Sequence, residues 1–149
     1  MFGGVTHLNL DPKNRIAIPA KYREELLATF GNRIIITLES PKYLLIYPES
    51  NWNIVREKIQ NLPTSSHPLV KSYQRLVLGY ADTVEMDKSG RILLPNVLKK
   101  LVNLEKDIVL VGLGNRFELW DKENWEAETE AALVASKDEL ANLLNGFSL

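Results

Sequence analysis

Two short charged segments hold the side chains of this 149-residue chain that are best suited to binding an anion. They are "DPKNR" at 11–15 and "DKSGR" at 87–91, each followed directly by Ile and three residues after that by Pro. An Asp at the first position can accept a hydrogen bond from the backbone two residues on and so nucleate a turn. Asn14 and Gly90, at the fourth position, belong to the residue types that tolerate a positive φ. The candidate binding residues are Asp11, Lys13, Asn14, Arg15, Asp87, Lys88 and Arg91.

Each segment predicts a compact loop with one cation near its tip and a second at the start of the next strand. An exposed Asp–Arg pair that only holds a turn would be worth roughly 0–1 kcal/mol. That interpretation suits a single loop, but stability does not require the same charged corner twice. Matched cationic loops suit a polyanion with repeated phosphates, and Arg15 and Arg91 could also read guanine edges in a major groove.

The two loops belong to an internal repeat. A shift of 76 residues superimposes 11–15 on 87–91, and a shift of 73 superimposes 46–52 on 119–125, both of which end in Asn-Trp. Two landmarks in the same order predict a tandem duplication, with a net loss of three residues in the second copy.

Both copies predict the same order of elements: a strand, the charged loop, a second strand, a helix, a hairpin and a closing helix. Prolines suit the first turn of a helix, which places the first helix of each copy after Pro19 and Pro95. Alternating apolar residues indicate the strands. The expected segments are 5–10, 16–18, 20–31, 33–39 with 43–48, and 48 onward, then 82–86, 92–94, 95–104, 107–112 with 116–120, and 121 onward.

These elements indicate an α+β fold in four segments. The first repeat spans 1–61, and residues 62–80 form a Pro- and Ser-containing linker followed by a bridging helix. The second repeat spans 81–125, and 126–149 form an acidic helical segment ending near Leu144. The buried side of the bridging helix is expected to hold Leu69, Val70, Tyr73, Leu76, Val77 and Tyr80.

Composition excludes several classes of protein. The chain has no cysteine, which excludes disulfides and a thiol nucleophile, and no apolar run long enough for a membrane helix. No secretory signal pattern opens it, so a cytoplasmic protein is expected. Net charge is −1, but residues 118–149 carry eight acidic and two basic side chains, which leaves +5 on residues 1–117. A basic face on the body therefore remains compatible with the composition.

Other candidate sites are weaker. His7 and His67 have no acidic partner at ligand spacing, so no metal site is expected, and no cofactor-binding or catalytic motif is present. Aromatic side chains could stack on bases, but their repeat-matched positions favour packing; they are Tyr47, Trp52, Trp120 and Trp125. A basic helix face could add phosphate contacts or simply be solvated; it comprises Lys21 and Arg23, partly echoed by Lys99 and Lys100.

Three segments, "MFGGVTHLNLDPKNRIAIPAKYRE", "LVLGYADTVEMDKSGRILLP" and "FELWDKENW", resemble the MraZ family of bacterial transcriptional regulators in the AbrB/MazE/SpoVT superfamily. The resemblance implies a split β-barrel of two swapped-hairpin, AbrB/SpoVT-like repeats within one chain. It implies a nucleoid-associated, ring-shaped homo-oligomer, octameric by resemblance. It also implies binding to double-stranded DNA, at short direct repeats in the promoter of the division and cell wall gene cluster. The family's DNA-contacting motif falls on Asp11, Lys13, Arg15, Asp87, Lys88 and Arg91.

One departure is 12–14, Pro-Lys-Asn, where many relatives carry a small residue and Gly before the Arg; Asn is expected to keep the loop shape. The sequence favours a DNA-binding repressor-type regulator. An antitoxin-like or scaffold protein, binding a protein partner through the acidic tail, remains the alternative. An enzyme is a third and weaker interpretation, because no nucleophile or metal-ligating set is visible.

Overall fold

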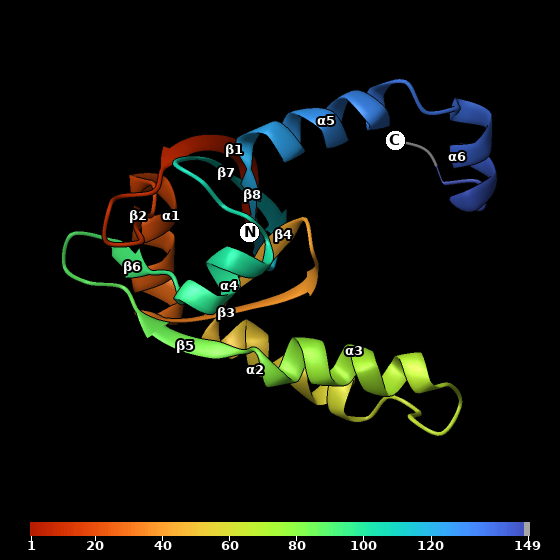
Figure 1. The fold of residues 1–149 in the computed structure, drawn as a ribbon, viewed down its shortest axis with the longest axis horizontal. Helices are drawn as coiled ribbons and strands as arrows, with labels where there is room; N and C mark the ends of the chain where they lie inside the picture. Colours follow the sequence, from red (N-terminus) through yellow and green to blue (C-terminus); the bar gives the residue numbers. More distant parts are fainter. Residues whose placement is uncertain (148–149) are drawn as a thin grey trace.

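In a computed structural model, which describes residues 1–147, the chain forms two antiparallel sheets and flanking helices (Figure 1). The strands are β1 (Phe2–Asn9), β2 (Arg15–Ala17), β3 (Arg33–Ser40), β4 (Tyr43–Pro48), β5 (Asp82–Glu85), β6 (Arg91–Leu93), β7 (Asp107–Gly114) and β8 (Phe117–Asp121). The helices are α1 (Ala20–Glu25), continued by the π-helical segment η1 (Leu26–Phe30), α2 (Glu49–Gln60), α3 (Pro68–Gly79), α4 (Asn96–Leu101), α5 (Lys122–Leu133) and α6 (Lys137–Leu143).

The two halves are interleaved in the sheets. The large sheet has the order β1-β7-β8-β4-β3-β5, so the first strand of each half pairs with the hairpin of the other half. The edge strands β1 and β5 each lead through a charged loop into β2 and β6, and these two strands pair antiparallel as a separate two-stranded ribbon. The predicted α+β split barrel of two half-repeats is confirmed, whereas the division at 61, 80 and 125 stays a prediction.

The observed elements lie close to the predicted ones, with small differences at their ends. β1 begins at Phe2 rather than at Val5, because its pairing with β7 continues to Gly114. The first helix finishes as a π-helical turn, in which the Gly31 N–H donates to the Leu26 carbonyl at 2.7 Å. Gly31 has a φ of 88° and a ψ of −164°, a backbone conformation that is essentially restricted to glycine.

The main core lies between the ribbon, the first helices and the inner face of the large sheet. Fully burying one such aliphatic side chain contributes about 1.5–3 kcal/mol. Pairs of residues related by the 76-residue shift are buried in this core, which shows that the halves pack equivalently; they include Leu10 with Met86, Ile16 with Ile92, Ile18 with Leu94, Tyr22 with Leu98, and Leu26 with Val102.

Helices α2 and α3 cover the outer face of β3 and β4. Val77 is 1% exposed, and its carbonyl accepts a 2.6 Å hydrogen bond from the buried Thr37 hydroxyl of β3. Gln74 donates at 2.8 Å to the Ile59 carbonyl near the end of α2. Two predictions for α3 are wrong, since Leu69 is 70% and Tyr80 40% exposed. Leu69 lies in the first turn of α3, which projects beyond the sheet, and Tyr80 lies just past its last turn (Figure 1).

The C-terminal helices α5 and α6 extend away from the barrel as an arm (Figure 1). Neither helix contains a buried residue, and Leu133 and Leu143 are 81% and 82% exposed. Within residues 1–147, no helix combines the length and apolar character that crossing a membrane requires.

Candidate nucleic-acid interface

The first loop, between β1 and β2, is built around the Asp11 carboxylate. One carboxylate oxygen accepts hydrogen bonds from the backbone N–H groups of Lys13 and Arg15, each at 2.8 Å. The other accepts from Arg15 Nε at 2.9 Å. The Asn14 N–H donates to the Asp11 carbonyl at 3.0 Å, and Asn14 takes a φ of 63°. The turn predicted from Asp and Asn is therefore present.

The second loop, between β5 and β6, repeats this geometry. One Asp87 oxygen accepts from the N–H groups of Ser89 and Arg91, each at 2.9 Å. The Gly90 N–H donates to the Asp87 carbonyl at 3.0 Å, and Gly90 has a φ of 77°. The loops differ at the arginines: Arg15 pairs with Asp11 through its side chain, whereas Arg91 bonds Asp87 through its backbone alone.

The loops are joined to each other through the ribbon. The Asn14 carbonyl of the first loop accepts from the Leu94 N–H at 2.8 Å, and the Gly90 carbonyl of the second loop accepts from the Ile18 N–H at 2.8 Å. Each loop is therefore bonded to the strand end of the other half. A displacement of one loop would disturb both.

The pairing of β2 with β6 places the two arginines on the same face of the ribbon. Arg15 lies opposite Leu93, and Arg91 lies opposite Ala17. Side chains alternate along a strand, and the intervening Ile16 and Ile92 point into the core at 1% exposure each. Arg15 and Arg91 are thus diagonal neighbours on the outer face, with Cα atoms roughly 7–8 Å apart.

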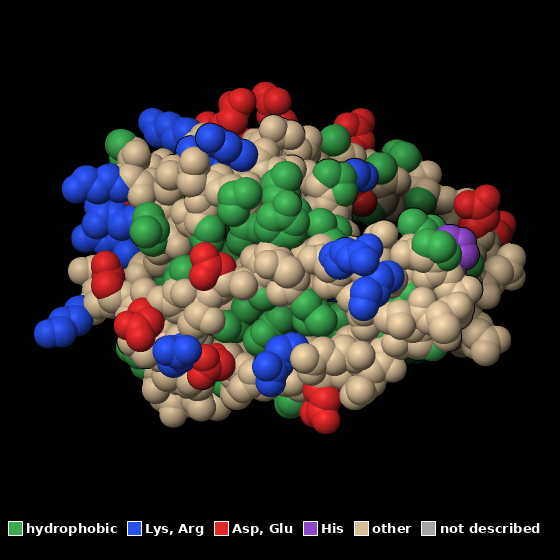
Figure 2. Space-filling view, turned by 60° about the horizontal axis from the view of Figure 1, so that its bottom comes forward, with side chains coloured by type: hydrophobic (Ala, Val, Ile, Leu, Met, Phe, Trp, Pro, Cys, Tyr) green, Lys and Arg blue, Asp and Glu red, His purple; other side chains and the backbone are tan. Residues whose placement is uncertain are grey.

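The loops concentrate positive charge at one end of the molecule. Lys13 and Lys88 are exposed at the loop tips. Figure 2 shows Lys and Arg side chains gathered at the end of the molecule where both loops lie in Figure 1. The structure therefore brings the sequence-predicted cations together on one surface.

Both loop aspartates are held in their charged form. The backbone N–H of Arg15, followed by the Arg15 side chain and the Lys13 N–H, lowers the pKa of Asp11 below its usual value. For Asp87, the Arg91 and Ser89 N–H groups lower the pKa, and the Arg91 and Arg15 charges add to this effect. The Arg15 charge thus acts on the aspartate of the opposite loop.

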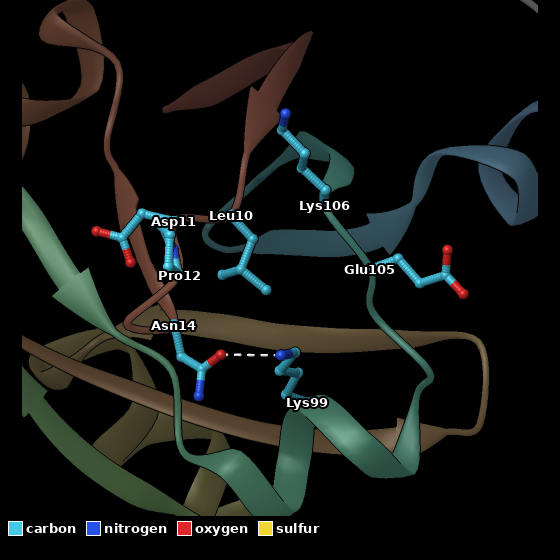
Figure 3. A pocket seen from close by; sticks show the side chains of 7 residues that line it. All are labelled: Leu10, Asp11, Pro12, Asn14, Lys99, Glu105 and Lys106. Atoms are coloured by element: carbon cyan, nitrogen blue, oxygen red, sulfur yellow. Dashed lines mark hydrogen bonds between the residues drawn. The ribbon is translucent and has the colours of Figure 1, made fainter.

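Two cations from the helices after the ribbon also reach the loops. Lys99 of α4 donates from Nζ to the Asn14 side-chain oxygen at 2.9 Å (Figure 3). Arg23 of α1 lies against Gly90 and donates from Nη2 to the Ile18 carbonyl at 3.0 Å. Both residues belong to the predicted basic helix face, but their contacts with the loops were not predicted. The 76-residue shift relates Arg23 to Lys99, and this equivalence was the feature of the sequence that indicated a shared role.

A hollow of about 380 Å³ lies between the first loop and α4 (Figure 3). Asp11, Pro12 and Asn14 line it on one side, and Lys99 and Glu105 on the other. It is continuous with the loop surface, and mixed charges line it. The hollow borders the candidate interface at the first loop.

The remaining candidates have structural roles. Trp52 and Trp120 are 5% and 4% exposed, so the packing interpretation of these side chains is confirmed. His67 caps α3 by accepting from the Leu69 N–H at 3.0 Å. In residues 1–147, no group of three or more His, Cys, Asp or Glu side chains is arranged to hold a metal ion.

The interleaved half-repeats and their paired cationic loops define a split-barrel protein of the AbrB/SpoVT-like class. The family described as "MraZ protein, putative antitoxin-like" matches residues 1–69 and 77–144. The chain is 53% identical to a protein named "Transcriptional regulator MraZ" from Chromobacterium violaceum and 45% identical to one of the same name from Nitrosomonas europaea. Each alignment covers 100% of both chains. The chain belongs to the MraZ family.

A solved structure, "The solution structure of PHS018 from pyrococcus horikoshii", shares a TM-score of 0.35 and 13% identity with this chain. The match covers 80% of this chain and 89% of that one.

Proposed function

We propose that this protein is a sequence-specific, DNA-binding transcriptional regulator. The full-length relatives are named as transcriptional regulators, not as enzymes. The observation that carries the proposal is the placement of Arg15 and Arg91 on the same outer face of a two-stranded ribbon. A ribbon of this kind fits the major groove of B-DNA, where arginine can bond guanine O6 and N7 together.

The loop residues have different roles in the proposed binding. Arg15 and Arg91 are the principal base contacts, and Lys13 and Lys88 attract phosphates from the loop tips. Asp11 and Asp87 hold the loops in shape through their backbone hydrogen bonds. Only one end of the molecule needs to be positive, which makes a net charge of −1 compatible with DNA binding.

The target and assembly follow from the resemblance. We propose that the protein represses the division and cell wall gene cluster by binding short direct repeats of double-stranded DNA in its promoter. It would do so as a ring-shaped homo-oligomer, octameric by resemblance, because several weak loop contacts on one assembly multiply through effective concentration. The exposed leucines of the α5–α6 arm support self-association. The protein would act in the cytoplasm, on the nucleoid, without a cofactor.

An electrophoretic mobility shift assay tests DNA binding with Arg15→Ala and Arg91→Ala on the fragment upstream of the protein's own gene. Each substitution should weaken binding by tenfold or more, since one bidentate arginine–guanine pair is worth about 1–3 kcal/mol of discrimination. Arg56→Ala changes an exposed residue of α2 and serves as the control that removes a charge away from the ribbon. Unaltered binding by Arg15→Ala at unchanged particle size would overturn the proposal.

The family description and the acidic arm favour a second candidate, an antitoxin-like or scaffold protein that binds a protein partner. Salt dependence separates the two. Binding to DNA should weaken steeply with salt, by a slope of about 0.9 per phosphate contacted. A specific complex that forms through the arm and persists in Arg15→Ala would favour the second candidate.

A further inference from the structure

Each half of the molecule places a helix cation on the charged loop of the other half. Arg23 follows β2 of the first half and lies on the loop at 87–91. Lys99 follows β6 of the second half and bonds the loop at 11–15. The 76-residue shift relates Arg23 to Lys99, and it relates Asn14 to Gly90. The two contacts are therefore the same contact made twice, with different residues.

In the second loop, the arginine occupies the space that a side chain would need. A Cβ atom added to Gly90 would lie 2.0 Å from Arg23 Nε and 2.5 Å from Cζ, far inside van der Waals contact. The guanidinium is held there by the 3.0 Å bond from Nη2 to the Ile18 carbonyl, and the Ile18 N–H in turn donates to the Gly90 carbonyl. With Arg23 in this position, a side chain at position 90 would have to displace the arginine.

In the first loop, the equivalent cation is Lys99, whose ammonium group is smaller than a guanidinium. It leaves room for the Asn14 side chain and donates a hydrogen bond to it. Lys99 Nζ donates to the Asn14 side-chain oxygen at 2.9 Å, as the dashed line in Figure 3 shows. Asn14 occupies the left-handed region at a φ of 63°, close to the 77° of Gly90, so the two loops share one backbone shape. The helix cation therefore packs against the fourth loop residue in both halves, as Lys99 with Asn14 in one and as Arg23 with Gly90 in the other.

We propose that Arg23 and Lys99 are positioning residues for the DNA-binding loops, each matched to the fourth residue of the opposite loop. The inference rests on the proposed function, because it concerns how the loops are held for DNA. Arg23 fixes the start of β6 and hence Arg91, and Lys99 fixes the start of β2 and hence Arg15. Neither cation needs to touch a phosphate for this role.

Exchanging the two residue pairs between the loops tests whether each helix cation is matched to the fourth residue of the opposite loop. Gly90→Asn alone should weaken operator binding by tenfold or more, because the new side chain collides with Arg23 while asparagine itself tolerates the backbone shape. Adding Arg23→Lys recreates the pair of the first loop and should restore affinity to within about threefold of the original. Lys99→Arg alone and Lys99→Arg with Asn14→Gly form the reciprocal pair. The readout is the mobility shift on the upstream fragment, with the thermal midpoint of each variant as a second measurement.

Salt dependence separates positioning from direct phosphate contact. If Arg23 bound a phosphate, Arg23→Met would reduce the slope of log affinity against log salt by about 0.9, and Arg23→Lys would keep affinity. Positioning predicts that Arg23→Met leaves the slope unchanged and that Arg23→Lys gains affinity when Asn replaces Gly90. A reduced slope would overturn the positioning role.

The outcomes distinguish this inference from the function on which it rests. Full binding by Arg15→Ala would remove the proposed function itself. If Arg15→Ala abolishes binding, the proposed function stands. If Gly90→Asn then binds DNA equally well with and without Arg23→Lys, the match between Arg23 and Gly90 is refuted. If Gly90→Asn unfolds the protein, recovery of the thermal midpoint by Arg23→Lys is the supporting result, and failure to recover it in both loops is the refuting one.

Discussion

A single residue, Asp87, combines two roles that substitution can separate. Its carboxylate organises the second loop through the Ser89 and Arg91 N–H groups, and it brings a negative charge to a surface proposed to bind phosphates. Its pKa is lowered by those bonds, so the charge is present throughout the neutral range and is lost only in acid below the usual carboxyl pKa.

Asp87→Asn should keep the loop and remove the charge, because the asparagine oxygen can accept both N–H groups. Affinity for the upstream DNA should rise roughly two- to fivefold, since one unit of repulsion disappears. Asp87→Ala removes the acceptors as well and should weaken binding by roughly tenfold. Fluorescence anisotropy with labelled DNA measures both. Equal losses in the two variants would mean that the charge, not the turn, is required.

The conformation of the loop residues could be predicted from the sequence, but their partners could not. The roles of Asp11, Asn14 and Gly90 could be predicted because turn chemistry acts within five consecutive residues. The partners of Asn14 and Gly90 could not, since Lys99 is 85 residues away from Asn14 and only the folded chain brings them together. The pairing of Arg15 with Arg91 on one face likewise depends on the register of β2 against β6.

At the scale of elements, the repeat predicted most strands and helices but not their partners. Local alternation of apolar residues identifies a strand, whereas the exchange of β1 and β5 between halves depends on contacts made across most of the chain. The resemblance, not the periodicity, supplied the swapped hairpins. The exposure of Leu69 and Tyr80 was missed because helical spacing does not show how far the sheet extends beneath α3.

The exchange of β1 depends on a close approach to β7 at Gly112. A Cβ atom there would lie 2.6 Å from the Gly3 nitrogen and 2.8 Å from the Phe2 carbonyl carbon, both backbone atoms that cannot rotate away. Gly112→Ala should therefore lower the free energy of unfolding by about 1–3 kcal/mol. Gly79→Ala is the matched control, because nothing lies within 4 Å of its Cβ position, and it should gain about 0.4–1 kcal/mol. Urea unfolding at fixed protein concentration measures both, and equal effects would refute the close approach.

The β8 strand contains a carboxylate whose charge opposes folding. Burial raises the pKa of Glu118, and this effect outweighs the hydrogen bond that Trp120 Nε1 donates at 3.0 Å. A carboxyl group with a raised pKa binds its proton more tightly in the folded state. Its contribution to stability is therefore present at low pH and is lost as pH rises from the usual glutamate pKa through the folded value.

Glu118→Gln keeps an acceptor for Trp120 and removes the charge. The variant should be more stable than the original protein at about pH 7, by less than about 1 kcal/mol because the group is partly solvated. The difference should shrink as the pH approaches about 4.3, the usual glutamate pKa, where the original side chain is itself protonated. Urea midpoints at the two pH values measure this. A difference that does not change with pH would show that the charge of Glu118 is not its cause.

At the scale of the whole molecule, opposite charges occupy different parts of the chain. Residues 118–149 carry six more acidic than basic side chains, whereas the loops gather cations at the far end of the barrel (Figures 1 and 2). Under the proposed function, this separation would keep the acidic arm away from DNA at the loops. It also leaves Leu133, Leu140 and Leu143 of the arm exposed, and a second copy could cover them.

Substitution within α6 tests that use of the arm without disturbing the barrel, because α6 buries no residue. Leu140→Glu with Leu143→Glu replaces two side chains that are 52% and 82% exposed, and should reduce the particle mass measured by light scattering. Lys137→Glu, on the same helix, changes the charge by the same two units and should leave the mass unchanged. Loss of assembly should weaken binding to DNA with several repeats far more than to DNA with one, because avidity is lost while each loop contact remains. An unchanged mass in the leucine variant would exclude α6 from the assembly. A lower mass with an equal loss of affinity for both DNAs would show that assembly does not increase affinity through avidity.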